Sequence, residues 1–183
     1  MILSEQTFIE LAGKQEVLDA KIKAANNVTD LPLRRIELYY RIELAECLNE
    51  LKGDFKHWSK KPMRRSEFIE ELVDALHFYL SYVNHYIEME KFFKISVNSE
   101  YRELVADYKG YTRYKEHKLA VQGEGEISPW KIASDAINHV KISNSFAALL
   151  YLAERYGYTE QDIIDTYNRK NAVNHDRSDS GVY

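Results

Sequence analysis

The stretch "IELAECLNEL" (residues 42–51) places Glu43 and Glu46 one turn apart beside the apolar side of a predicted helix. A later stretch, "EELVDALHF" (residues 70–78), repeats this pattern of an acidic pair on an apolar helix. Residues three apart on a helix are surface neighbours, with Cβ atoms roughly 5–6 Å apart. Each pair can therefore direct two carboxylates at one place, which predicts an acidic site within a helical bundle.

The second acidic pair is Glu71 and Asp74. The connector between the two helices is short, so we expect the helices to be antiparallel neighbours whose four carboxylates converge. Carboxylates this close raise one another's pKa, and burial adds to the effect. A hard divalent cation resolves that conflict, since Mg²⁺ prefers carboxylate and water oxygens and keeps waters that phosphates can replace. The pattern predicts a Mg²⁺ site that receives a phosphorylated substrate.

The competing interpretation is a solvated acidic face that forms salt bridges within each helix. Leucines next to both acidic pairs argue against this interpretation, because the two helix faces that carry the pairs cannot both be fully exposed to solvent. Three further acidic residues of these helices are expected to be solvated and to lie outside the site: Glu37, Glu50 and Glu67.

The composition indicates one all-α domain spanning residues 1–183. Only 7 Gly and 3 Pro interrupt 183 residues, which favours long helices, and no strand pattern of useful length is present. The net charge of −4 argues against a general nucleic-acid binder. The single cysteine excludes an intrachain disulfide, and no run of 18 apolar residues occurs. We expect a cytoplasmic protein with no membrane partner.

Apolar periodicity and capping residues predict six helices. Their approximate ranges are 4–26, 33–51, 66–93, 99–118, 129–157 and 159–170. Ser4 is the expected N-cap of the first, Pro129 the first residue of the fifth, and Thr159 with Asp162 an approximate capping box. The stretch "VQGEGEIS" (121–128) is predicted to be a loop, and residues 171–183 a polar tail that closes on the phosphate site.

Four stretches together resemble a known family. They are "ELAECLNE" (43–50), "FKHWSKKP" (55–62), "EELVDALHFYLS" (70–81) and "YNRKNAVNHDR" (167–177). In this order they are similar to the all-α nucleotide pyrophosphohydrolases of the MazG-like superfamily. More narrowly, the chain resembles the dimeric dUTPases of bacteria, their phages and some protozoa. The resemblance covers most of residues 15 to 177 and implies a helical bundle of that type.

The resemblance implies hydrolysis of dUTP, and also of dUDP, to dUMP by a water molecule activated with two or more Mg²⁺ ions. Glu43, Glu46, Glu71 and Asp74 would bind the ions, and Glu43 would deprotonate the water. A homodimer is also implied, and the aromatic surplus could cover its helix-to-helix contact. The substrate contacts implied by the matching motifs are Gln15, Trp58, Lys61, His77, Tyr167, Lys170, Asn171, Asn174 and Arg177.

These substrate contacts have distinct expected roles. Trp58 would line the base pocket, Gln15 would lie near the sugar or base, and His77 would pack beneath the nucleotide. The cationic and amide residues from Lys170 to Arg177 would hold the phosphates, with help from Tyr167 and Lys61. If helical, residues 170, 171, 174 and 177 share one polar face.

The chain departs from the family pattern after Arg177. The pattern commonly continues with Gln and a later Gly-Tyr pair, whereas Ser178 follows here and Val182 separates Gly181 from Tyr183. Two other functions stay open at this point. One is a house-cleaning pyrophosphatase for dCTP or modified nucleoside triphosphates, and the other is a non-enzymatic helical interaction module.

Overall fold

The computed structural model of the chain describes residues 1–122 and 127–181. Within these ranges the chain forms α-helices, two 3-10 turns and no strand, which confirms the predicted all-α class. The helices are α1 (Glu5–Ala25), α2 (Leu33–Asn49), α3 (Arg65–Met89), α4 (Val97–Gln122), α5 (Pro129–Asn138), α6 (Ile142–Arg155) and α7 (Glu160–Ser180). The 3-10 turns span Lys52–Asp54 and Lys91–Phe93. Residues 123–126 of the predicted loop at 121–128, together with Val182 and Tyr183, lie outside the described residues, and residues 121–122 belong to α4.

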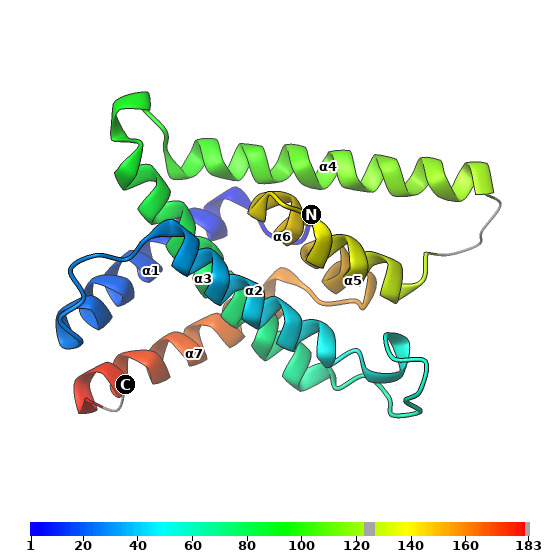
Figure 1. The fold of residues 1–183 in the computed structure, drawn as a ribbon, viewed down its shortest axis with the longest axis horizontal. Coiled ribbons are helices and arrows are strands. Elements are labelled where there is room, and N and C mark those ends of the chain that lie inside the picture. Colours follow the sequence, from blue (N-terminus) through cyan, green and yellow to red (C-terminus); the bar gives the residue numbers. More distant parts are fainter. Residues whose placement is uncertain (123–126, 182–183) are drawn as a thin grey trace.

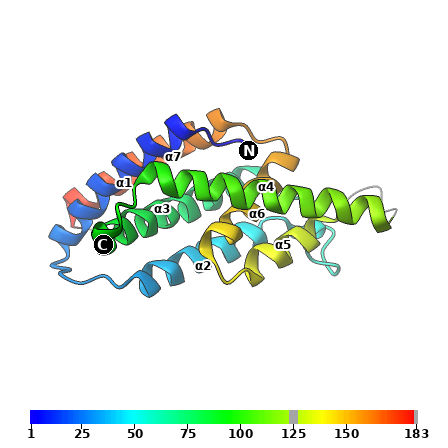
Figure 2. The same cartoon turned by 90° about the horizontal axis from the view of Figure 1, so that it is seen from above.

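Helix α3 is the centre of the bundle and contacts α1, α2, α4, α6 and α7. Figure 1 shows α2 lying along α3, with α4 crossing above them and α1 and α7 side by side at the lower left. Figure 2 shows α3 between the α1–α7 pair and α2. None of the described helices combines the length and apolar character that a membrane span requires.

The core around α3 is aromatic. Tyr79 stacks on Phe146 with ring centroids 4.4 Å apart, and Tyr40 packs against both rings. The Tyr40 hydroxyl is buried and forms a hydrogen bond of 2.9 Å with the Ser145 hydroxyl. Such rings bury a large apolar area while their polar tips require partners. Tyr40 and Tyr79 therefore join α2, α3 and α6.

The three predicted helix starts are confirmed. The Ser4 side chain accepts a hydrogen bond from the Thr7 amide, and Pro129 is the first residue of α5. Thr159 and Asp162 form a complete capping box, in which each side chain bonds the other residue's backbone amide.

The predicted single helix over residues 129–157 is wrong, because the chain breaks between α5 and α6. His139 is extended, with φ −65° and ψ 123°. Carbonyl groups around the break are bound from elsewhere: Arg41 of α2 donates to the carbonyl of Val140 at 2.9 Å, and Ser145 donates to the carbonyl of Ala136 at 2.6 Å. These partners are distant in sequence, so local periodicity could not indicate the break.

The predicted polar tail after residue 170 is also wrong in its secondary structure, because α7 continues to Ser180. Lys21 of α1 holds this extension through an ion pair with Asp179 (2.7 Å) and a hydrogen bond to the carbonyl of His175 (3.3 Å). Ser178 is buried. Packing against α1 thus extends a helix whose own sequence is too polar to indicate it.

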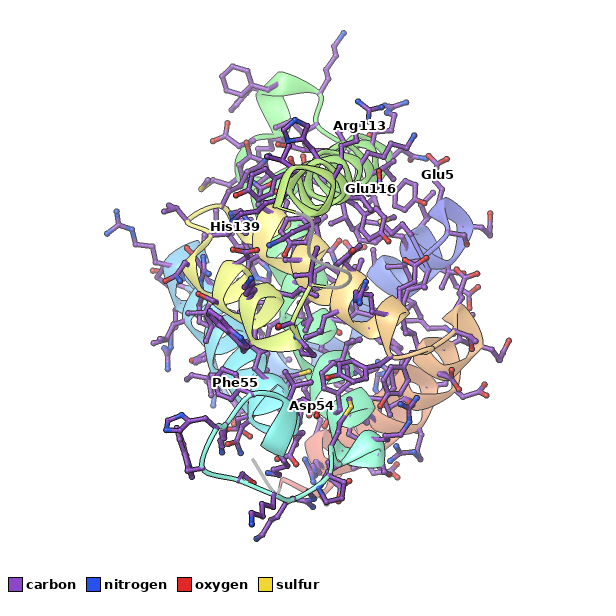
Figure 3. The ribbon with its side chains drawn as sticks, turned by 90° about the vertical axis from the view of Figure 1, so that its right-hand side faces the viewer. Glu5, Asp54, Phe55, Arg113, Glu116 and His139 are labelled. Carbon is purple, nitrogen blue, oxygen red and sulfur yellow. The ribbon has the colours of Figure 1, made fainter. Side chains whose placement is uncertain are left out.

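Residues 50–64 connect α2 to α3 and close on themselves. The Gly53 amide donates to the Lys61 carbonyl (3.0 Å), and the Arg64 amide donates to the Glu50 carbonyl (2.9 Å). Asp54 and Phe55 lie in this connector at the lower end of the bundle in Figure 3, and Asp54 accepts a hydrogen bond from the Tyr156 hydroxyl at 2.8 Å. The closed connector sets α2 and α3 antiparallel.

Gly53→Ala is expected to lower the free energy of unfolding by about 1–3 kcal/mol. A Cβ at this position would lie 2.9 Å from the Lys61 carbonyl oxygen and 3.0 Å from that of Ser59, so the connector must shift. Gly13→Ala is the matched control, because nothing lies within 4 Å of its added Cβ in the middle of α1. That change should stabilise by up to about 1 kcal/mol. Urea unfolding measures both, and equal stabilities for the two variants would contradict the expectation.

Candidate active site

Three acidic side chains converge where α2 lies against α3. Carboxylate oxygens of Glu43, Glu46 and Glu71 all lie within 4.8 Å of one another. Glu46 is exposed, whereas Glu43 and Glu71 are half-buried. Among the described residues this is the one group with the spacing that a bound metal ion requires. The i, i+3 spacing on α2 and the antiparallel neighbour α3 bring these groups together as the sequence predicts.

The electrostatics of the cluster favour a bound cation. Burial, followed by Asp74, Glu46 and Glu71, raises the pKa of Glu43 to about 7, against a smaller opposing effect of Lys170. Burial and Asp74 likewise raise the pKa of Glu71. The carboxylates therefore cannot all ionise at neutral pH without a counter-charge. Hard carboxylate oxygens at this spacing fit Mg²⁺.

Asp74 stands beside the cluster and is held by α7. Its carboxylate forms an ion pair with Lys170, and both side chains are about one-fifth exposed. Burial raises the pKa of Asp74, while Lys170 and then Arg177 oppose that effect. The C-terminal half of α7 thus brings two cationic side chains to the four carboxylates.

The two amides predicted on this face of α7 lie next to Lys170 in the helix. Asn171 is half-buried, and its Nδ2 has no hydrogen-bond partner among the described residues. Asn174 is also half-buried. Because α7 is helical beyond residue 170, these amides, Lys170 and Arg177 share the one face that their spacing predicts.

Gln15, His77 and Tyr167 form a buried network beneath the carboxylates. Gln15 Oε1 accepts from the Tyr167 hydroxyl (2.9 Å) and from His77 Nδ1 (2.6 Å), while its Nε2 donates to Asp19 (2.7 Å). The His77 ring stacks on Tyr167 with centroids 4.1 Å apart. The proton on Nδ1 leaves His77 Nε2 as a lone-pair acceptor, and that buried atom has no partner among the described residues.

His77 should make the folded state sensitive to acid. Burial lowers its pKa to about 3, whereas an unfolded histidine titrates near about 6.5. The folded state therefore binds fewer protons, and stability is lost as the pH falls from about 6.5 towards 3, by up to about 1.4 kcal/mol per pH unit. Chemical unfolding of His77→Gln between pH 7 and 5 should show a shallower slope than the unaltered chain. His117→Gln, an exposed control on α4, should keep the full slope, and equal slopes for all three proteins would contradict this assignment.

Trp58 and Lys61 do not join the carboxylate cluster. Trp58 is 72% exposed in the connector, with its indole edge-on to the His57 ring. Both residues line a separate cavity of about 650 Å³, together with Lys52, Lys56, Ser59, Lys60 and Arg64. None of the four acidic residues lines that cavity. The connector therefore offers a basic, aromatic surface next to the site.

The expectation that Glu50 is solvated is wrong. Its side chain is buried and forms ion pairs with Lys52 (3.0 Å) and Arg64 (3.3 Å). Its charge also raises the pKa of Glu71, so Glu50 couples the basic connector to the cluster. The sequence did carry a signal for Glu50, because it follows Glu46 by four residues and so lies on the same face of the predicted helix as Glu43 and Glu46. Asp19, which binds Gln15, was likewise missed and lies four residues after Gln15 on α1.

A carboxylate cluster between two antiparallel helices, with Lys170 of a third helix paired to Asp74 beside it, suits the metal-dependent hydrolysis of phosphate anhydrides. A family model described as dUTPase matches residues 7–182. The chain therefore belongs to the all-α dUTPase family, and its reaction is the hydrolysis of dUTP to dUMP. No curated protein matches the chain.

Proposed function

We propose that this site hydrolyses dUTP between its α- and β-phosphates in a Mg²⁺-dependent reaction that releases pyrophosphate, and that it also hydrolyses dUDP. The convergence of Glu43, Glu46 and Glu71 within 4.8 Å carries the proposal, because such a group is tolerable only with a cation. Two or more bound Mg²⁺ ions would neutralise the carboxylates and stabilise the charge that develops on the phosphate oxygens. Asp74 would complete the ligand set once Lys170 releases it.

The protein groups have separate roles in this proposal. Glu43 would take the proton of the attacking water, since a carboxylate beside a metal-bound water can accept its proton. Arg177 offers planar paired donors to a phosphate, and Lys170 acts as a mobile point charge. Asn171 and Asn174 would add amide donors to the phosphates. Through these contacts the C-terminal end of α7 would close on the phosphate site.

The nucleoside contacts form the other half of the proposal. Gln15, His77 and Tyr167 form a rigid floor beneath the nucleotide, since each is bound or stacked within one buried network. Trp58 and Lys61 would reach the nucleotide from the connector, which requires the connector to move towards the cluster when substrate binds. Exposure of 72% leaves the Trp58 indole free to make that contact.

A panel of deoxynucleoside triphosphates, with and without Mg²⁺, tests the proposed function. Release of pyrophosphate and of the corresponding nucleoside monophosphate is measured for dUTP, dCTP and dTTP, and phosphate release for dUDP. We expect Mg²⁺-dependent turnover of dUTP and dUDP and little turnover of the others. Equal rates for dUTP and dCTP would favour the house-cleaning pyrophosphatase. Turnover of dUTP in excess chelator would overturn the metal role.

We also propose that the chain acts as a cytoplasmic homodimer. An apolar face on α2 and α5, which are in contact, supports this. Its exposed members are Leu38 and Ile42 of α2, Ile137 of α5 and Val140 of the turn that follows α5. Apolar residues gathered on one surface are typical of a subunit contact. Sedimentation equilibrium should give twice the chain mass of 21.5 kDa, and a single chain mass at micromolar concentration would refute the dimer.

A further inference from the structure

A cavity of about 210 Å³ lies between α2, α3, α4 and the turn that joins α5 to α6. None of the four site carboxylates lines it. Its walls combine aromatic rings with carboxylates. The tyrosines and glutamates that line it are Glu37, Tyr79, Tyr82, Tyr86, Glu100 and Glu103. The tyrosines come from the half of α3 that follows the acidic cluster, so the cavity is distinct from the candidate active site.

One of the three carboxylates in this cavity has no cation. Glu37 is paired with Arg41 at 3.0 Å, and Glu103 is paired with Lys141. Glu100 forms no ion pair or hydrogen bond with any described residue. Burial and the Glu103 charge raise the pKa of Glu100, and Lys141, which also lines the cavity, opposes them only in part. The cavity therefore holds an excess of negative charge at Glu100.

The Tyr79 hydroxyl also lacks a partner in this cavity. Tyr79 is 1% exposed and makes no hydrogen bond within the described residues, whereas the comparably buried Tyr40 and Tyr167 both do. Tyr79 and Glu100 both line the cavity, and the charge of Glu100 adds to burial in raising the pKa of Tyr79. A side chain this buried whose hydroxyl has no protein partner can hydrogen-bond to a group bound in the cavity.

The wall beside these two groups is aromatic. Tyr82 and Tyr86 lie one turn apart on α3, and their rings are nearly parallel, with an interplanar angle of 13° and centroids 6.2 Å apart. Faces of aromatic rings attract cations, particularly where water is partly excluded. Val83 and Val140 add apolar surface to the lining.

A single metal ion does not fit this arrangement. The carboxylates of the cavity do not bring ligand atoms within 4.8 Å of one another, as those of the acidic cluster do. The occupant must instead carry its positive charge on a larger body with N–H donors and an apolar part. We propose that this cavity binds a primary alkylammonium ion, of the diamine and polyamine class, with its ammonium between Glu100 and Tyr79 and its chain against Tyr82 and Tyr86.

Calorimetric titration of putrescine and spermidine into the intact chain tests the proposal. Excess Mg²⁺ is present so that the acidic cluster is occupied, and no nucleotide is needed, so the result is independent of hydrolysis. We expect one saturable site per chain. Glu100→Gln should weaken binding by about tenfold or more, because it removes a charge-assisted hydrogen bond. Tyr79→Phe should weaken it severalfold.

Glu116→Gln is the matched control, since it removes an exposed carboxylate from the same helix (Figure 3). It should leave the affinity unchanged, and thermal unfolding verifies that every variant is folded. Absence of saturable binding would overturn the proposal. So would equal affinities in the unaltered, Glu100→Gln and Tyr79→Phe proteins, or equal binding of a neutral alcohol of the same chain length.

Discussion

Glu43→Gln is expected to lower dUTP turnover by about 10³-fold, while the protein stays folded. General base catalysis contributes roughly 10²- to 10⁴-fold, and a neutral amide cannot accept the water proton. The same change removes the carboxylate whose pKa burial, Asp74, Glu46 and Glu71 raise, and so relieves the crowding of charge in the cluster. The metal-free variant should therefore unfold at the same temperature as the unaltered chain or at a higher one, which separates a lost catalytic group from a lost fold.

Steady-state assays of pyrophosphate release, run with thermal unfolding in chelator, measure both effects. Glu67→Gln is the control: this acidic residue lies in the first turn of α3 and pairs with Arg64 outside the cluster. It should retain most of the turnover. Normal turnover by Glu43→Gln would remove Glu43 as the base. A large loss of thermal stability in that variant would mean that the carboxylate supports the fold instead.

The part of the site that the sequence could predict is the part fixed by local geometry. Glu43 and Glu46 converge because helical spacing alone places them together, and Glu71 joins them because a short closed connector makes α3 antiparallel to α2. The predicted starts of α1, α5 and α7 are confirmed for the same reason, since a helix cap depends on residues within one turn.

The errors arose where distant side chains decide the outcome. Arg41 of α2 binds a carbonyl at the break between α5 and α6, and Lys21 of α1 holds the end of α7. Glu50 is buried because Lys52 and Arg64 enclose it. The contacts of Arg41 and Lys21 have no periodic signature in the sequence, whereas the place of Glu50 on the same helix face as Glu43 and Glu46 was a signal. They follow from the way the connector closes and α1 packs on α7.

The ion pair between Lys170 and Asp74 has a consequence for the order of binding. Asp74 cannot serve fully as a metal ligand while Lys170 holds its carboxylate. If the proposed function is correct, Lys170 must move from Asp74 to a phosphate when nucleotide and Mg²⁺ arrive. In the proposed function Lys170 would therefore compete with Mg²⁺ for this carboxylate.

Lys170→Gln is therefore expected to change metal binding and catalysis in opposite directions. Without nucleotide, the affinity for Mg²⁺ should rise by about threefold to tenfold, because the competing charge is gone and the pair is only partly screened. With dUTP, kcat/KM should fall by roughly 10- to 100-fold, because a charged hydrogen bond to phosphate is lost. Calorimetric Mg²⁺ titration and initial rates measure the two quantities on one preparation.

Arg169→Gln supplies a closely matched control for this prediction. Arg169 is the preceding residue on α7 and binds Glu70 of α3 at 3.0 Å, so its ion pair joins the same two helices outside the cluster. Both partners are more exposed than Lys170 and Asp74, and the loss of this pair should change neither quantity by more than about twofold. If Lys170→Gln lowered the affinity for Mg²⁺ together with kcat/KM, the lysine would be positioning Asp74 rather than competing for it. If Arg169→Gln reproduced the effects of Lys170→Gln, the docking of α7 on α3 would explain them, and the proposed transfer of Lys170 to phosphate would fail.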